Sequence, residues 1–266
     1  IKYLPRFYLP VWISITTPIY ILILFLGGYF LMFRRFFQRI LNMKKIIICN
    51  DLWRSVNEKK DLFIFISLSI FSIYAVFLNV AMLSGWRHFY FMHIYITYIS
   101  IYMINIALNL FIRKKIRIIY FNLINFLFIF LIISQIYIFH PYQSLFFNSF
   151  INEKNIKRFP VDTPSLSRSD ALKQIVQLYT GSKKIFVANA SWTPFYNGKD
   201  MLNKQDQDKF VFVGQDYDKA DYIYTSFNYE VDPNFNKKYN IPEQFKEIKK
   251  MQIKNIPIYS IYKRIK

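Results

Sequence analysis

The amino-acid sequence predicts an α-helical polytopic membrane protein of about four transmembrane helices, followed by a small α/β extracytoplasmic domain. Residues 62–83 and residues 89–112 contain no Asp, Glu, Lys or Arg, and each stretch is long enough to cross a hydrocarbon core of about 30 Å as a helix. From about Asn152 onward, charged residues are mixed with short β-rich runs, which indicates a separately folded domain. We therefore expect a transmembrane region over residues 1–150 and a domain over residues 151–266.

The composition fits a membrane protein although the chain is strongly basic. It is 54% hydrophobic and carries a formal charge of +19. That charge on a soluble protein would suggest nucleic acid as the partner, but the apolar residues here are gathered into long blocks, so we expect the lipid bilayer and no nucleic acid. The single cysteine, Cys49, excludes an internal disulfide. Because the chain opens with Ile1 and shows no signal-peptide layout, we expect it to be the C-terminal part of a longer protein.

The predicted spans cover residues 9–33, 62–83, 89–112 and 118–139. In the first span, Pro18 predicts a kink and Gly27–Gly28 a close helix contact. Arg34–Arg35 are expected to end it, and an amphipathic surface helix is expected over residues 36–48. In the third span, Tyr95, Tyr98 and Tyr102 share one helix face. That face is expected to pack against neighbouring helices, with a polar substrate path as the alternative.

Basic clusters fix the expected orientation. The loops over residues 34–61 and 113–117 are rich in Lys and Arg, so the positive-inside rule places both in the cytoplasm. The short turn around Gly85 and the exit at His140 then lie on the other side. We therefore expect a multi-pass protein of the plasma (inner) membrane with its C-terminal domain on the periplasmic, or extracytoplasmic, side.

The C-terminal domain reads as alternating strands and helices. A helix is expected through residues 171–179, with N-cap candidates before it and Gly181 as its stop. Short strands are expected at residues 184–188, 210–213 and 221–225, and a hairpin of residues 249–254 and 256–262 is expected to turn near Asn255. This alternation predicts a small α/β fold.

The stretch Gly85-Trp86-Arg87-His88-Phe89-Tyr90-Phe91 joins the second and third spans. It places a permanent cation and an imidazole among aromatic rings at a membrane surface, and ionisable groups at such a depth are functional candidates by default. An arginine fork and a histidine donor suit phosphate oxygens, so Arg87 and His88 are candidate donor-phosphate-binding residues for an anionic lipid head group. The alternative is that Trp86, Arg87 and Tyr90 are ordinary interfacial anchors.

Few other motifs indicate a catalytic, metal-binding or substrate-binding role. The spacing of His88 and His93 does not favour zinc, and neither a P-loop nor a G-x-G-x-x-G sequence is present, so we expect no metal and no cofactor. Asp162 is either a site carboxylate or a helix or loop cap. The candidate substrate-binding residues are Trp86, Tyr90, His140, Tyr142 and Asp162.

The order of motifs resembles a known family. The block Ser84 to Phe91 is followed by a span, a basic cluster, another span and then His140-Pro141-Tyr142-Gln143-Ser144-Leu145-Phe146-Phe147-Asn148. This series is similar to the C-terminal portion of bacterial polytopic membrane glycosyltransferases of glycosyltransferase family 39, relatives of the dolichyl-phosphate-mannose protein mannosyltransferases. Ser84 stands where that pattern has an aspartate, and the segment from Val161 to Ser167 lacks the usual aromatic pair after Asp162.

The resemblance implies an enzyme that transfers a sugar, with inversion, from a polyprenyl-phosphate-linked donor to an extracytoplasmic acceptor in the synthesis of cell-envelope glycans. The acceptor is a glycan, a lipid or a protein. The resemblance also implies that the catalytic base lies upstream of these residues, and that Arg87 and His88 hold the donor phosphate. The alternative from the residues themselves is a non-enzymatic transporter or flippase component, or a membrane-anchored binding protein for lipid-linked glycans.

Overall fold

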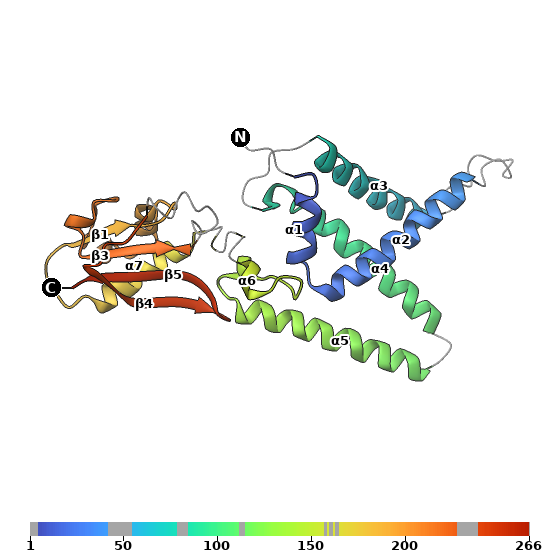
Figure 1. The fold of residues 1–266 in the computed structure, drawn as a ribbon. Helices are drawn as coiled ribbons and strands as arrows, with labels where there is room; N and C mark the ends of the chain where they lie inside the picture. Colours follow the sequence, from blue (N-terminus) through green and yellow to red (C-terminus); the bar gives the residue numbers. More distant parts are fainter. Residues whose placement is uncertain are drawn as a thin grey trace. The chain divides into compact units, whose positions relative to one another are not determined.

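The computed structural model describes residues 5–41, 55–78, 85–111, 115–156, 159, 162, 165–227 and 239–265. The chain divides into two compact units, one formed by residues 1–137 with 147–150 and the other by residues 138–146 with 151–266. The predicted fold class is confirmed (Figure 1): in the described part of the chain, four helices are long and apolar enough to cross a membrane, and a small mixed α/β domain follows.

The helices of the first unit are α1 (Tyr8–Thr16), α2 (Ile19–Leu41), α3 (Val56–Phe77), α4 (Met92–Phe111) and α5 (Lys115–Ile138). The kink predicted near Pro18 is a full break between α1 and α2. Proline forces the residue before it out of the helical region, and Thr17 is accordingly extended, with φ −95° and ψ 135°. The segment predicted as one span is therefore two helices.

Two predicted boundaries at the α2–α3 connection were wrong. Arg34–Arg35 do not end the first span, because α2 continues to Leu41; arginine is a good helix former. The predicted surface helix over residues 36–48 is thus partly the end of α2, and the rest lies outside the described residues. Helix α3 begins at Val56 rather than at residue 62, because the Ser55 side chain accepts a hydrogen bond from the Glu58 backbone N–H at 3.2 Å, a cap typical of S-x-x-E sequences.

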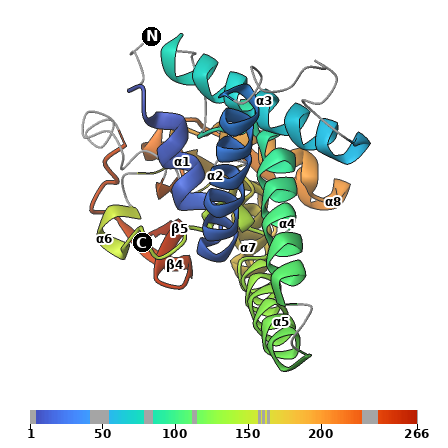
Figure 2. The same ribbon diagram turned by 90° about the vertical axis from the view of Figure 1, so that its right-hand side faces the viewer.

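Helices α2 and α4 cross in close contact (Figure 2). A Cβ atom at Gly28 would lie 2.4 Å from the Ile99 carbonyl oxygen, so only glycine allows this approach of the two backbones. Beside it, the Ser100 hydroxyl donates to the Ile21 carbonyl oxygen at 3.2 Å. The helix contact predicted at Gly27–Gly28 is confirmed, and it lies between α2 and α4.

Helix α5 meets the rest of its unit at the start of α2. Tyr20 stacks on Phe128 with ring centroids 4.2 Å apart, and its hydroxyl donates to the Asn125 side-chain oxygen. The apolar span of α5 is otherwise unburied within the unit. A helix that is apolar all round suits a lipid environment or contact with further helices.

The second unit is built on a five-stranded sheet of order β2-β1-β3-β5-β4. Its strands are β1 (Ile185–Asn189), β2 (Phe210–Phe212), β3 (Tyr222–Ser226), β4 (Phe245–Ile253) and β5 (Ile256–Arg264). Strands β2, β1 and β3 are parallel, whereas β5 runs antiparallel to both β3 and β4. All three predicted strands and the predicted hairpin are present, and β3 is buried along its whole length.

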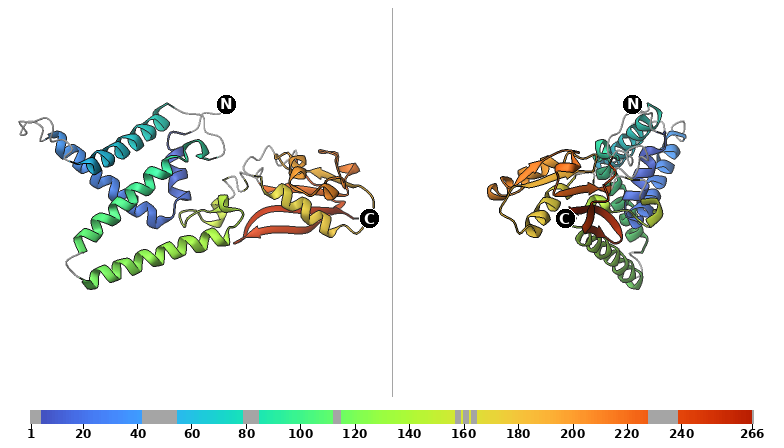
Figure 3. Two further views of the ribbon diagram at one scale, coloured as in Figure 1. Left: turned by 180° about the vertical axis from the view of Figure 1, so that it is seen from behind. Right: turned by 60° about the vertical axis from the view of Figure 1, so that its left-hand side comes forward.

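The hairpin turn and the covering helix follow from local sequence. Lys254 and Asn255 both have positive φ, 46° and 63°, as a two-residue turn between antiparallel strands requires. Helix α7 (Ser167–Leu178) packs on one face of the sheet through residues that include Leu172 and Ile175 (Figure 3). It begins four residues earlier than the helix predicted from residue 171. The remaining short helices are α6 (Glu153–Ile156), α8 (Lys204–Gln207) and the 3₁₀ segments η3 (Arg87–Phe89), η4 (Gln143–Leu145), η5 (Phe195–Met201) and η6 (Tyr217–Lys219).

Candidate functional site

The turn before α4 is held rigidly against α1. Gly85 has φ +74°, and a Cβ there would meet the Trp12 ring at 3.4 Å. The Trp86 ring is buried, and its Nε1 donates to the Thr16 hydroxyl at 3.1 Å. Phe89 is buried as well. Residues 87–89 form the 3₁₀ segment η3, so α4 begins at Met92 rather than at residue 89. The 3₁₀ segment η3 is thus fixed from both sides.

The two candidate phosphate-binding side chains, Arg87 and His88, remain exposed to solvent although the turn is anchored. Arg87 and His88 are exposed in the middle of the turn, and neither side chain makes a hydrogen bond or an ion pair with any residue that the structure describes. Tyr90 and Phe91, which follow, are 54% and 39% exposed. A free guanidinium and a free imidazole beside exposed aromatic rings can receive an anionic head group attached to an apolar tail. Ser84 lies outside the described residues.

Trp86 has a different environment from the other candidates in this turn. It is 2% exposed, and its ring lies 5.3 Å from the Tyr90 ring and 4.3 Å from the His93 ring, centroid to centroid. Its contacts are therefore those of a packing residue that orients η3. Tyr90, by contrast, keeps most of its ring available.

The other predicted candidates belong to the second unit. His140 is exposed, and its Nδ1 lies 2.9 Å from the Gln143 side-chain nitrogen; the peptide bond between His140 and Pro141 is cis. Tyr142 is buried, and its hydroxyl donates to Asp170 at 3.3 Å. The structure thus places Trp86, Arg87, His88 and Tyr90 in the first unit and His140, Tyr142 and Asp162 in the second.

Asp162 makes the contacts of a helix cap. Its carboxylate oxygens accept from the backbone N–H groups of Leu166 at 3.0 Å and Ser167 at 3.2 Å, and from the Ser167 hydroxyl. The same hydroxyl lies 2.6 Å from the Tyr224 hydroxyl. Burial raises the pKa of the Asp162 carboxyl above its ordinary value, although the hydrogen bonds from Ser167 and Leu166 oppose that rise. Burial likewise raises the pKa of Tyr224 to about 12, so this tyrosine stays neutral at physiological pH.

Sequence reasoning missed the partners of Asp170. Its Oδ2 accepts from the Tyr259 hydroxyl at 2.7 Å as well as from Tyr142, which ties α7 to β5 and to the segment of residues 138–146. Burial and the Asp170 carboxylate both raise the pKa values of these tyrosines. The acidic residue in the first turn of the helix was visible in the sequence, but the two tyrosines lie 28 and 89 residues away from it, and no local signal connects them.

The last residue of the His140 to Asn148 motif has a structural role in the first unit. The Asn148 amide nitrogen donates to the carbonyl oxygens of Ser14 at 2.6 Å and Thr17 at 2.7 Å, and its backbone N–H donates to Ile15 at 2.9 Å. These carbonyl groups lose their helical partners where α1 ends before Pro18. Asn148 therefore supplies the hydrogen bonds that these carbonyl groups lack at the break between α1 and α2.

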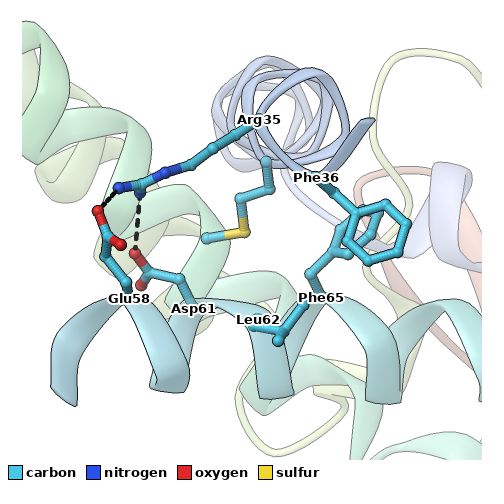
Figure 4. Close-up of a pocket in the computed structure, with 7 residues that line it drawn as sticks. Arg35, Phe36, Glu58, Asp61, Leu62 and Phe65 are labelled. Carbon is cyan, nitrogen blue, oxygen red and sulfur yellow. Dashed lines mark hydrogen bonds and ion pairs between the residues drawn. The ribbon is translucent and has the colours of Figure 1, made fainter. Parts of the chain in front are cut away.

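A second cluster, of charged side chains, lies where α2, α3 and α4 meet. It is at the start of α3, whereas the turn that carries Arg87 follows the end of α3. Arg35 forms ion pairs with Glu58 and, at 3.7 Å, with Asp61 (Figure 4). Arg39 lies 3.7 Å from Glu58, and the Tyr98 hydroxyl donates to Asp61 at 2.8 Å. These groups border a narrow cavity lined by Met32, Arg35, Phe36, Glu58, Asp61, Leu62 and Phe65. The cluster was missed because its acidic residues were assigned to a loop; the S-x-x-E cap at Ser55 was the available signal.

Tyr98 confirms the packing role predicted for the tyrosine face of the third span, since its partner is on α3.

Within the described residues, no group of three or more His, Cys, Asp or Glu side chains is placed to hold a metal ion.

Comparison with known proteins finds no matching family model, no matching curated protein and no matching solved structure. The class that the fold defines is a multi-pass membrane protein with four candidate spans and a mixed five-stranded α/β domain.

Proposed function

We propose that this chain is part of an integral membrane glycosyltransferase that transfers a sugar from a polyprenyl-phosphate-linked donor to an extracytoplasmic acceptor. One observation carries the proposal: Arg87 and His88 are exposed on a turn that Trp86 and Gly85 fix against α1. The resemblance of the motif series to glycosyltransferase family 39 supplies the reaction.

The proposed role of the turn is to bind the donor phosphate. When the glycosidic bond to the phosphate breaks, the bonding electrons and their negative charge remain on the phosphate oxygen. Arg87 offers two parallel N–H donors to that oxygen and its neighbour, and His88 offers a third. Because the backbone that carries both side chains is anchored through Gly85 and Trp86, they stabilise this charge without a large reorganisation of the turn.

The surroundings of the turn suit the lipid part of such a donor. Tyr90 is 54% exposed, Phe91 is 39% exposed, and Ile94 on the first turn of α4 is 69% exposed. A polyprenyl chain is apolar, so it can lie along this surface while its phosphate reaches Arg87. The acceptor oxygen bonds to the sugar carbon that the phosphate leaves, and its proton passes to a base that the resemblance places outside these residues.

The ion-pair cluster gives the alternative function a specific basis. Ionisable groups within spans mark substrate or proton pathways in many transporters, and Arg35, Glu58 and Asp61 lie in two such helices. In this chain, however, the acidic groups are already paired with arginines and a tyrosine. That internal pairing favours a structural link between helices, whereas Arg87 is unpaired among the described residues.

The test uses the full gene product purified in detergent and incubated with polyprenyl-phosphate sugars and a solubilised membrane extract that supplies glycan, lipid and protein acceptors. Release of the polyprenyl phosphate should fall at least about 100-fold in Arg87→Ala, the scale of losing one charge-stabilising group. It should recover only in part in Arg87→Lys, which keeps the charge but not the fork. Arg117→Ala is the matched control, because Arg117 is an exposed arginine near the start of α5. Unchanged release in folded Arg87→Ala would remove this residue from the mechanism and favour the transporter or binding-protein alternative.

A further inference from the structure

The sheet of the second unit has a topological switch point between β1 and β3. These two strands are adjacent and parallel. The chain that leaves β1 next joins the sheet at β2 on one side, whereas the chain that leaves β3 next joins it at β4 and β5 on the other side. In open α/β sheets, ligands bind at the carboxyl ends of strands where the connections diverge in this way.

The segment that leaves β1 at this point, residues 189–198, is uncharged and aromatic. It contains no Asp, Glu, Lys or Arg, although the whole chain carries a formal charge of +19. Buried and exposed residues alternate along it: Ser191, Thr193 and Phe195 are buried, whereas Trp192 and Tyr196 are 68% and 61% exposed. The two largest side chains of the segment, Trp192 and Tyr196, therefore face solvent, while Ser191, Thr193 and Phe195 are buried.

The backbone that carries Trp192 is held from several directions. The side-chain nitrogen of Asn189 donates to the Thr193 carbonyl oxygen at 2.6 Å. The Ser191 and Ser226 hydroxyls are 2.5 Å apart, and this hydrogen bond joins the ends of β1 and β3. Arg168 on α7 donates to the Pro194 carbonyl oxygen at 3.1 Å. A ligand that stacks on Trp192 therefore meets a backbone that is already ordered, and binding loses little conformational entropy.

The chemistry of this surface selects the ligand. An exposed indole and phenol ring offer flat, electron-rich faces to aliphatic C–H groups. The segment has no charged residue to pair with a phosphate or carboxylate, and the guanidinium beside it, that of Arg168, donates to the carbonyl oxygens of Ser165 and Pro194. A pyranose ring has a C–H face for stacking and hydroxyls at its edge that remain hydrated or hydrogen-bonded. We propose that Trp192 and Tyr196 form a binding surface for a neutral sugar unit of a glycan acceptor. The identity of that sugar as the acceptor rests on the proposed function.

The test measures binding of the full chain in detergent to an array of neutral linear oligosaccharides. Wild type should bind at least one of them, Trp192→Ala should weaken this binding about tenfold, and Trp192→Phe should keep part of it. Met201→Ala is the control, since Met201 is a 62% exposed side chain at the end of η5. Binding that is equal in wild type and Trp192→Ala, or wild type that binds none of the oligosaccharides, overturns the proposal.

A second measurement separates a sugar surface from a contact with lipid. Trp192→Cys in a Cys49→Ser background gives one site for a spin label in protein reconstituted in nanodiscs. The label should be more accessible to an aqueous nickel reagent than to oxygen, and the opposite result identifies a membrane contact and overturns the sugar surface. The two proposals fail separately, because oligosaccharide binding is measured without any donor: Arg87→Ala should leave this binding unchanged, and a loss of binding in Trp192→Ala does not depend on donor turnover.

Discussion

Replacing Gly28 by alanine is expected to destabilise the helical unit, whereas the same change at Gly27 is not. The new Cβ at Gly28 would lie 2.4 Å from the Ile99 carbonyl oxygen and 2.9 Å from its Cγ2. A backbone oxygen in a helix cannot rotate away, so α2 and α4 must separate by about 1 Å to bring that 2.4 Å approach to ordinary contact at 3.4 Å. At Gly27 the Cβ meets only the flexible Met103 side chain, at 3.4 Å or more.

The magnitude follows from three contributions. Overpacking a tight contact costs about 1–3 kcal/mol. The separation also breaks the 3.2 Å hydrogen bond from Ser100 to Ile21, although the Ser100 hydroxyl keeps its 2.8 Å bond to the Ile96 carbonyl oxygen. This loss therefore costs at most about 0.6 kcal/mol, the average for interhelical hydrogen bonds in membranes. The higher helix propensity of alanine acts equally in both variants and cancels in their difference. We therefore expect Gly28→Ala to have a free energy of unfolding about 2 kcal/mol lower than that of Gly27→Ala.

The assay is thermal unfolding of the full chain in detergent, followed by circular dichroism. A difference of about 2 kcal/mol corresponds to a difference in Tm of about 4–8 °C for a chain of this size. Gly27→Ala serves as the matched control, because it makes the same chemical change one residue away on the same helix. Equal Tm values for the two variants would refute the close approach of α2 and α4 at Ile99.

Three further predictions concern the anchors of the two units, each measured by unfolding of the full chain. Trp86→Phe and Thr16→Val should each lower the free energy of unfolding by about 1 kcal/mol, and the double variant should lose less than the sum because both remove one hydrogen bond; additive losses would contradict the bond. Burial raises the pKa of Asp162, so the ionised carboxylate costs folding free energy and this cost disappears as the pH falls through the raised pKa. The stability of wild type relative to Asp162→Asn should therefore increase from pH 7 toward pH 4, and a constant difference would argue against the raised pKa. Tyr259→Phe should cost about 1.5–3 kcal/mol, because it removes a donor from the Asp170 carboxylate; a loss below about 0.5 kcal/mol would show that this hydrogen bond contributes little.

Long uninterrupted apolar runs and alternating patterns were sufficient to predict the architecture. The absence of charge over residues 62–83 and 89–112 predicts helices because a membrane helix needs only length and hydrophobicity. The hairpin at Asn255 and the break at Pro18 are also local, since each depends on the φ and ψ angles of one or two residues. The helix boundaries near Arg35 and Glu58 were predicted wrongly, because the charges there were read as loop residues although they are paired across two helices.

The candidate site likewise combines features that the local sequence predicts with features that depend on distant contacts. The order of residues along the chain is enough to place Arg87 and His88 among aromatic residues between two apolar segments and to predict the α/β domain that follows. The fold was needed to show that Trp86 is an anchor, that Tyr142 is buried against Asp170, and that Trp192 is exposed on an ordered segment. Burial and hydrogen-bond partners depend on residues brought together from far apart in the chain, as Tyr142 and Asp170 are, whereas hydrophobic runs and turn preferences are properties of neighbours in sequence.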